Sequence, residues 1–304
     1  MTSPVDHDPP DVTATPDVTD VTAIDMHVHV EADAHGHLSL DQELLDASAA
    51  YFKADVPRTP TVDQIAAHYR ERRMRAVIFT VDASTQLGHP ALSSADIVAA
   101  AAHHRDVLIP FGSVDPRRPD AVEVLRSLIA AGVRGMKFHP SLQGFAPNSI
   151  EYYPLYELMS EHGLIATFHT GQTGIGAGLP GGRGIKLSYS NPALLDDVAA
   201  DFPALPIVMA HPAVPWTDVA LSVLTHKANV HMDLSGWLPK YLPAQLVHQL
   251  NRSLRHKMLF GSDFPVISPD RWLASFDQLA VEPEVRELVL VGNASRLLRL
   301  GEPA

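Results

Sequence analysis

Eight short runs rich in β-branched and other apolar residues alternate with helix-like segments along the chain, and this alternation constrains the fold most. Most runs are apolar nearly throughout, as expected for strands that are buried on both faces of a sheet. Successive runs begin 24 to 52 residues apart, and most of these intervals match the length of one βα unit. The runs span residues 24–30, 76–82, 108–116, 135–140, 165–171, 206–212, 230–236 and 258–265.

Eight strands that alternate with helices fit either a closed (β/α)8 barrel or an open doubly wound sheet. The candidate catalytic residues favour the barrel, because they fall at or near the carboxyl ends of the runs, the face on which barrel enzymes build their sites. On an open sheet these residues would be spread out, whereas closure brings the eighth strand beside the first. We therefore predict a single-domain α/β protein with the (β/α)8 TIM-barrel fold. The strand-end residues are His27, His29, His169, His211 and Asp263.

The first run carries three polar residues at alternating positions, Asp25, His27 and His29. Side chains two positions apart on a strand lie on one face, so we expect all three to project into the barrel. Two imidazoles in this arrangement can bind one metal ion together, whereas on a helix they would point apart. Because the chain has no cysteine, any metal must be held by histidine nitrogens and carboxylate oxygens.

Local signals divide the chain into a tail and one barrel domain. Residues 1–20 are rich in Pro, Asp and Thr and poor in bulky apolar residues, so we expect a flexible tail there and a barrel over 21–304. Thr61 and Gln64 predict a capping box at a helix start. The other helix signals are Pro119, Pro154 and Pro192 at starts and Gly132 and Gly163 at ends.

Composition excludes several classes of partner. The 23 basic and 35 acidic residues give a formal charge of −12, which repels phosphate backbones and argues against nucleic acid as a partner. No apolar run approaches the roughly 20 residues that span a bilayer, and no signal peptide opens the sequence. We therefore expect no membrane partner, and the absence of cysteine suits a cytoplasmic protein.

The motifs IDMHVH, FHTG, MAHP and GSDFP, with the closing NASRLL stretch, resemble the amidohydrolase superfamily over residues 24–298. They are most similar to the branch that includes the aminocarboxymuconate-semialdehyde and γ-resorcylate decarboxylases. The resemblance implies one divalent ion, usually zinc with manganese as the alternative. Its ligands would be His27, His29, His169 and Asp263, while His211 would orient the metal-activated water. Asp263 would also accept the proton of that water and pass it to the leaving group.

Lys137 bears on the number of metal ions. In binuclear members of the superfamily, a carboxylated lysine after the fourth strand bridges two ions. Lys137 and His139 lie on one face of the fourth run, so they are candidates for a second metal site or for substrate contact. Alternatively, Lys137 is an ordinary amine that pairs with Asp25 or with the substrate. The mononuclear branch manages without the bridge, so we predict a single ion.

Two loops are predicted to border the active site. The glycine-rich segment 170–192 follows the fifth run, and its Arg183 and Lys186 could contact a carboxylate or phosphate if the segment is a lid rather than a surface loop. The 52-residue first interval marks an insertion that could cap the mouth, and we expect its His35 and His37 to be solvent-exposed.

Aromatic residues after the sixth and seventh runs are candidates for substrate contact. Trp216 and Trp237 could wall a substrate ring, although packing against loops would explain them as well.

These features predict a metal-dependent hydrolase in which a zinc-activated water attacks a carbonyl. The central part of the chain also resembles the β-ketoacyl-CoA hydrolases of aromatic-acid catabolism, which cleave a C–C bond. The partner would then be a small carboxylic acid or an acyl-CoA, and proteins of this branch are often homodimers. Non-oxidative decarboxylation of an aromatic or enol acid is the alternative reaction. A non-catalytic binding barrel would have lost a ligand, and none is missing here.

Overall fold

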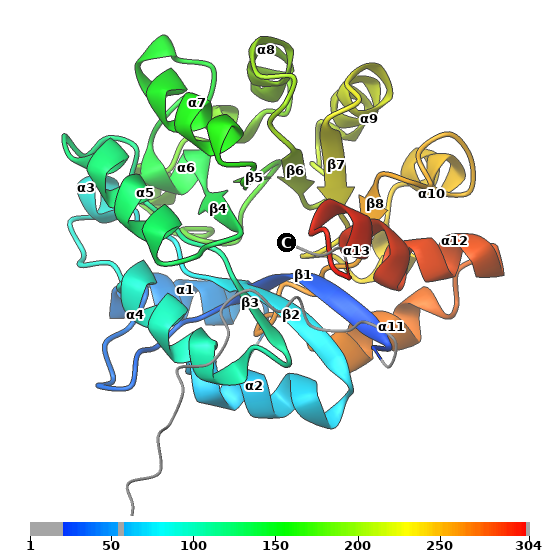
Figure 1. Cartoon of the computed structure of the whole chain (residues 1–304), viewed down its shortest axis with the longest axis horizontal. Helices are drawn as coiled ribbons and strands as arrows, with labels where there is room; N and C mark the ends of the chain where they lie inside the picture. Colours follow the sequence, from blue (N-terminus) through cyan, green and yellow to red (C-terminus); the bar gives the residue numbers. More distant parts are fainter. Residues whose placement is uncertain (1–20, 54–57, 302–304) are drawn as a thin grey trace, which may run out of the picture.

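The computed structural model describes residues 21–53 and 58–301 of the chain. Eight parallel β-strands occupy its centre and helices surround them (Figure 1). Each strand begins within two residues of the run that predicted it, so the predicted strands are confirmed. The strands are β1 (Ala23–His29), β2 (Met74–Phe79), β3 (Leu108–Pro110), β4 (Gly135–Phe138), β5 (Ile165–His169), β6 (Ile207–Ala210), β7 (Val230–Asp233) and β8 (Met258–Leu259). The predicted tail, residues 1–20, lies outside the described residues.

Helices fill every interval between the strands and follow β8. No helix in the described ranges is both long and apolar enough to cross a membrane. The α-helices are α1 (Gln42–Tyr51), α2 (Val62–Glu71), α3 (Ser84–Leu87), α4 (Ser94–Ala101), α5 (Ala121–Ala130), α6 (Pro140–Gln143), α7 (Tyr153–Glu161), α8 (Leu194–Asp201), α9 (Thr217–His226), α10 (Ala244–Leu250), α11 (Pro269–Phe276), α12 (Pro283–Glu287) and α13 (Asn293–Leu297). Shorter helical turns are η1 (Ala102–His104), η2 (Ile150–Tyr152), η3 (Pro180–Gly184), η4 (Leu187–Ser190), η5 (Pro239–Tyr241) and η6 (Leu288–Gly292).

The strands close into a barrel. Hydrogen-bonded ladders join β1-β2-β3 and β4-β5-β6-β7-β8 in order. Two parallel bridges connect these ladders. Gly112, just after β3, pairs with Met136 of β4, and Val28 of β1 pairs with Phe264 in the segment after β8. The closed ring confirms the TIM-barrel prediction and excludes the open doubly wound sheet.

Two apolar layers hold the barrel together. The inner layer fills the barrel with side chains such as Ile24, Met26, Phe79 and Leu259, all less than 2% exposed. The outer layer packs the opposite faces of the strands against the surrounding helices. Strands buried on both faces must be apolar throughout, which explains the near-continuous apolar runs of the sequence.

A bulge in β1 overturns one prediction. The pairing register of β1 with β2 shifts between Asp25 and Val28, so the simple two-residue alternation fails there. Asp25 does not project into the barrel with His27. Instead, its carboxylate faces the helical layer, where it accepts hydrogen bonds from the Tyr69 hydroxyl of α2 at 2.7 Å and the Ser262 N–H at 2.9 Å.

Most helix signals mark the observed ends. Thr61 and Gln64 form the predicted capping box of α2. Gly132 and Gly163 adopt positive φ just beyond α5 and α7, a conformation that favours glycine. Of the three prolines, Pro154 lies in the first turn of α7. Pro119 and Pro192 each precede their helix by two residues.

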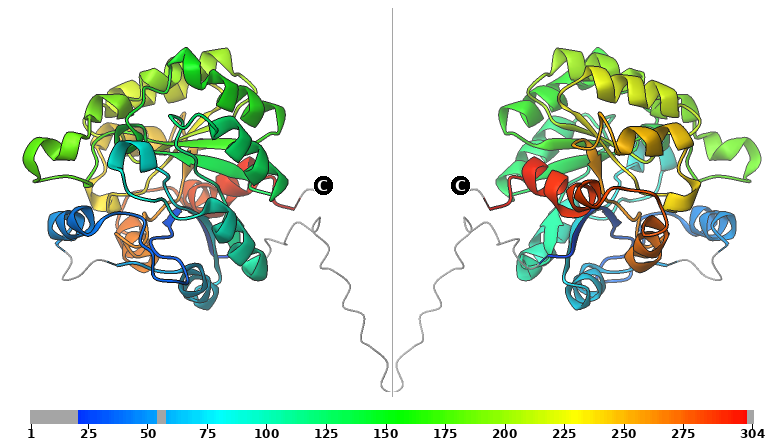
Figure 2. Two further views of the ribbon diagram at one scale, coloured as in Figure 1. Left: turned by 90° about the vertical axis from the view of Figure 1, so that its left-hand side faces the viewer. Right: turned by 90° about the vertical axis from the view of Figure 1, so that its right-hand side faces the viewer.

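The insertion after β1 and the glycine-rich segment after β5 lie at the same end of the molecule. Figure 2 shows α1, which belongs to the insertion, and the region of η3 protruding together there. Both segments contribute side chains to one cavity at the carboxyl ends of the strands. The insertion therefore lies at the mouth of this cavity, as predicted.

Candidate metal centre and active site

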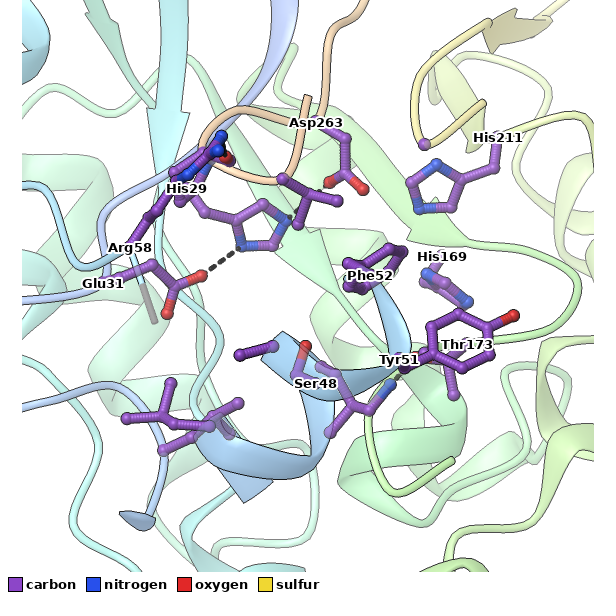
Figure 3. A pocket seen from close by; sticks show the side chains of 18 of the residues that line it. His29, Glu31, Ser48, Tyr51, Phe52, Arg58, His169, Thr173, His211 and Asp263 are labelled. Atoms are coloured by element: carbon purple, nitrogen blue, oxygen red, sulfur yellow. Dashed lines mark hydrogen bonds and ion pairs between the residues drawn. The ribbon is translucent and has the colours of Figure 1, made fainter. Parts of the chain in front are cut away.

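The strand ends surround a cavity of about 330 Å³. Its floor carries charged and imidazole side chains from several strands, whereas its walls come mainly from α1 and the loops after β5, β7 and β8 (Figure 3). A cavity of this size suits a small organic ligand. The predicted residues on its lining are His29, Lys137, His139, His169, His211, Trp237 and Asp263.

Three donor atoms converge beside this cavity. The Nε2 atoms of His27 and His29 lie 3.2 Å apart, and each is 3.3 Å from Oδ1 of Asp263. Ligands of a tetrahedral zinc site, each about 2.1 Å from the ion, are separated from one another by about 3.4 Å. These three side chains therefore have both the chemistry and the spacing to hold one divalent ion.

His27 is neutral and has a defined tautomer. Burial lowers the pKa of its imidazole to about 3, and the nearby Lys137 charge acts in the same direction. Its Nδ1 lies 3.0 Å from Oδ2 of Asp233, a carboxylate that can only accept. The ring proton is therefore on Nδ1, and the Nε2 lone pair faces His29 and Asp263. A metal ligand needs this unprotonated nitrogen.

Asp263 connects the end of the barrel to its beginning. Its backbone N–H donates to the His27 carbonyl at 3.0 Å, and its φ of 69° lies in the left-handed region. For an aspartate this conformation is strained, and such strain persists only where surrounding contacts impose it. Burial opposes ionisation of the side chain, but the hydrogen bond with His29 and the neighbouring imidazoles outweigh it and keep the pKa well below its usual range.

A second carboxylate lies behind His29. Oε1 of Glu31 is 3.6 Å from Nδ1 of His29, on the side of the ring away from Asp263 (Figure 3). Burial raises the pKa of Glu31 although the His29 charge opposes this effect. Each imidazole of the cluster therefore has a carboxylate beside its Nδ1 atom, Glu31 for His29 and Asp233 for His27.

Lys137 lies inside the barrel, with its Nζ 3.1 Å from Nε2 of His27 and 4.9 Å from the centre of the Phe79 ring. Burial lowers the pKa of its amine to about 8, while Asp233 and Asp263 favour the charged form. The expected alternative pairing with Asp25 is wrong, because the bulge in β1 turns Asp25 toward α2. A bridging role for Lys137 stays a prediction.

His139 and His169 form a stacked pair at the floor of the cavity. Their ring centres are 3.8 Å apart with an interplanar angle of 9°, and burial keeps the pKa of each well below its usual range. Nε2 of His169 lies 3.2 Å from the Gln172 carbonyl oxygen. His169 therefore borders the cavity but lies outside the cluster of three donors, and its predicted role as a ligand stays a prediction.

His211 lies between the cluster and this stacked pair. Its ring centre is 4.8 Å from that of His27 and 4.7 Å from that of His169. Burial lowers its pKa although Asp263 and Asp233 oppose this effect. The backbone φ of His211 is 74°, so this residue, like Asp263, lies in the left-handed region.

Asp233 and Ser235 are site residues that the sequence patterns did not single out. Both are fully buried at the end of β7, where Asp233 contacts His27 and the Ser235 hydroxyl lies 2.9 Å from Nδ1 of His211. The signal that could have found them is the VHMDLSG run itself, in which a strand that is otherwise apolar ends in an aspartate and a serine. Only the aromatic residues after this strand were predicted to reach the site.

Three of the four predicted substrate contacts do not line the cavity. Arg183 instead pairs with Asp41 at 3.1 Å and with Glu43 at 2.8 Å, both beside α1, because η3 turns its side chain toward that helix. Lys186 is exposed with its amine over the Tyr189 ring, and Trp216 is half-buried away from the cavity. Trp237 does line the cavity.

Other cations occupy the mouth. Lys53, Arg58 and Arg271 line it, and within the described ranges none of the three forms an ion pair. Arg58 only donates to the Pro265 carbonyl, at 3.3 Å. Lys53 and Arg58 lacked a sequence signal because they lie inside the insertion after β1, between α1 and α2, where no pattern marks a cavity. The neighbouring walls are apolar and aromatic, and include Leu45, Tyr51, Phe52, Trp237 and Val266.

His35 and His37 are exposed, as predicted. They line a separate cavity beside His89, and Nδ1 of His37 is 2.6 Å from Asp33. Neither residue lines the cavity at the strand ends.

Solved structures share this architecture. An uncharacterised TIM-barrel protein from Bordetella bronchiseptica has a TM-score of 0.75 and 22% identity, over 91% of this chain and 98% of that one. A probable 2-pyrone-4,6-dicarboxylic acid hydrolase from Acinetobacter baumannii, with citric acid bound, has a TM-score of 0.63 and 17% identity over 92% and 100%. A dihydroxybenzoic acid decarboxylase from Polaromonas, with manganese and an inhibitor, has a TM-score of 0.63 and 14% identity over 93% and 98%.

At these identities the likeness shows the fold alone, and the family is shown by sequence. No curated protein matches the chain. The sequence model described as amidohydrolase matches residues 24–300, which cover every strand of the barrel and every member of the donor cluster. The chain therefore belongs to the amidohydrolase family.

Proposed function

We propose that this protein is a metal-dependent hydrolase that acts on a small carboxylic acid. The observation that carries the proposal is the convergence of His27, His29 and Asp263, with donor atoms 3.2–3.3 Å apart beside a cavity with a basic mouth. Zinc or manganese would be held by these three side chains, with His169 as the expected fourth ligand. When bound, such an ion polarises a carbonyl oxygen and lowers the pKa of a water ligand.

The residues around the cluster supply proton transfer. Nε2 of His211 is free of protein partners in the described part of the chain and is the base that accepts a proton from the attacking water. Asp263 accepts the second proton of that water as the carbonyl is attacked and delivers it to the leaving group, while His211 releases the first proton to solvent. Burial favours neutral His211, whereas the hydrogen bond with His29 and the neighbouring imidazoles keep Asp263 ionised, and these are the two states that the roles require.

The mouth indicates the substrate class. Arg58, Arg271 and Lys53 have no ion-pair partner among the residues that the structure describes, in a chain whose formal charge is −12, so an anionic ligand is the expected partner. Phe52 and Trp237 supply flat apolar surface for a ring. A cavity of about 330 Å³ holds a substituted aromatic acid or the acyl part of a thioester, but not a whole coenzyme A.

An aromatic β-ketoacyl-CoA is thus a narrower version of this proposal. Two cations, Arg183 and Lys186, were expected to bind its phosphates. Arg183 is already paired with Asp41 and Glu43, and Lys186 does not line the cavity. A free carboxylic acid needs no partner for phosphates, and therefore fits the mouth better.

Non-oxidative decarboxylation is the second candidate. The observation that favours it is Lys137, a buried amine with a pKa of about 8 beside the donor cluster, which could protonate a ring carbon as CO2 leaves. Several structural neighbours are themselves decarboxylases.

Isotope labelling separates the two reactions. The metal-loaded protein is incubated in H2(18)O with aromatic and enol carboxylic acids, their lactones and their acyl-CoA esters, and both products and CO2 are analysed. Hydrolysis places 18O in a product carboxylate without CO2 release. CO2 release with a proton at the former carboxyl carbon and no 18O in the organic product would reject the hydrolase proposal.

A further inference from the structure

Asp233 is fully buried, and both of its oxygens are used. Oδ2 accepts from Nδ1 of His27 at 3.0 Å. Oδ1 accepts from the Ser235 hydroxyl and from two backbone amides, the N–H of Ser235 at 3.1 Å and the N–H of His211 at 3.4 Å. One carboxylate therefore contacts a proposed metal ligand directly and the proposed base through a serine.

The number of protons on each group determines which atom donates in the hydrogen bonds between Asp233, Ser235 and His211. A serine hydroxyl has one proton, and Ser235 gives it to Asp233, which as a carboxylate can only accept. The 2.9 Å contact between the Ser235 oxygen and Nδ1 of His211 must then have the imidazole as donor. His211 consequently carries its proton on Nδ1 and presents an unprotonated Nε2, as His27 does.

Two glycines leave the space that this arrangement needs. A Cβ at Gly261 would lie 3.1 Å from Oδ1 of Asp233, 2.9 Å from the Ser235 Cβ and 3.1 Å from the His27 Cβ. A Cβ at Gly236, where φ is +73°, would lie 2.6 Å from Nδ1 of His211. At both positions a side chain would displace atoms of the hydrogen-bonded network, and the chain has glycine there.

We propose that Asp233 is a positioning residue that sets the tautomers of His27 and His211 together, with Ser235 relaying its effect to His211. It prepares one imidazole to bind the metal and the other to accept a proton, so that binding and proton transfer depend on the same buried carboxylate. The inference rests on the proposed function for the role of His211, but the hydrogen-bond relay stands on its own geometry.

Two variants separate the branches of the relay. Ser235→Ala removes the hydroxyl that joins Asp233 to His211 but leaves the bond between Asp233 and His27 in place. We therefore expect metal affinity within about twofold of wild type but loss of the fixed Nδ1–H tautomer of His211. In Asp233→Asn the side-chain amide has a single acceptor oxygen, whereas both oxygens of Asp233 accept hydrogen bonds in the wild type. Either His27 or Ser235 must therefore lose its acceptor. We expect it to change the tautomer of at least one ring and to weaken metal binding 10- to 100-fold, the usual effect of losing such an outer partner. Ser113→Ala is the matched control, because this buried strand-end hydroxyl contacts only backbone groups.

The readouts are 15N NMR of histidine-labelled, metal-free full-length protein and Mn²⁺ affinity measured by titration. Nδ1–H tautomers at both His27 and His211 in the wild type, with the selective losses above, would support the proposal. An unprotonated Nδ1 at His211 in the wild type would overturn it, as would Ser235→Ala weakening Mn²⁺ binding as much as Asp233→Asn. If no substrate is ever turned over, the proposed function fails, yet these two measurements still decide the relay.

Discussion

At the scale of single residues, the site depends on side chains that each meet two demands. Asp263 bonds to the backbone of β1 and also faces the two imidazoles of the donor cluster. His27 offers one nitrogen to the cluster and the other to Asp233. Substitutions that preserve shape but change proton content are therefore the most informative ones here.

Asp263→Asn removes the negative charge and the proton acceptor but keeps the size of the side chain. Because an amide is a poorer ligand and cannot take a proton, we expect kcat/KM on an identified substrate to fall about 10²–10⁴-fold and Mn²⁺ affinity to fall as well. Steady-state kinetics and metal titration measure the two effects. Asp270→Asn, an exposed change on α11, is the control. Full turnover by Asp263→Asn would contradict the proposed mechanism.

The residue scale also shows what sequence patterns could not reach. His27, His29 and Asp263 were predictable because strand periodicity and barrel closure bring them together. Asp25 was misplaced, because a one-residue bulge changes the face of a side chain and leaves no mark in the pattern of apolar residues. Asp233 was missed because its function lies in its hydrogen bonds to His27 and Ser235, which only the packed structure reveals.

At the scale of elements, α1 and the glycine-rich segment after β5 contact each other across the mouth. Arg183 pairs with Asp41 and Glu43 at the first turn of α1. At the other end of the helix, a Cβ on Gly174 would lie 2.6 Å from the Phe52 ring, so this ring packs directly against the backbone of the glycine-rich segment. The sequence predicted both segments at the mouth, but not that Arg183 joins them.

Arg183→Gln should loosen this contact. Exposed ion pairs contribute about 0.2–1 kcal/mol each, so we expect KM to rise about two- to fivefold with a smaller change in kcat. Arg70→Gln removes a similarly exposed pair with Asp106 far from the mouth and is the control. Raising the salt concentration should increase the wild-type KM more than that of Arg183→Gln, because salt screens the cations of the mouth in both proteins but the ion pairs of Arg183 only in the wild type. An unchanged KM in the variant would show that the ion pairs do not hold the mouth.

At the scale of the whole molecule, the fold was the most predictable property. Eight apolar runs, spaced by the length of a helix and two loops, leave few architectures, and the strand-end histidines decided between them. Loop conformation was the least predictable, because short polar segments such as η3 carry no periodicity. Arg58 lies in a loop and Arg271 on the polar side of α11, where no pattern marks a cavity, so both emerged only from the structure.

Stability of the whole molecule should depend on pH through His231 in β7. Burial, with the Lys257 and Arg296 charges, lowers its pKa to about 4 from an ordinary 6.5, and its Nδ1 is buried without a hydrogen-bond partner among the described residues. Between these two values the unfolded chain binds a proton that the folded chain does not. The contribution of His231 is therefore complete above about pH 6.5 and is lost as the pH falls toward 4.

His231→Gln removes this titration. Between pH 7 and pH 5, we expect the wild type to lose about 1–2 kcal/mol more of its unfolding free energy than the variant does. Urea unfolding with a chelator present, at pH 5, 6 and 7, measures the difference without a contribution from metal binding. His103→Gln, an exposed change in η1, controls for the loss of a histidine in general. A difference between wild type and His231→Gln that stays constant with pH would mean that the folded protein accepts the proton as readily as the unfolded chain.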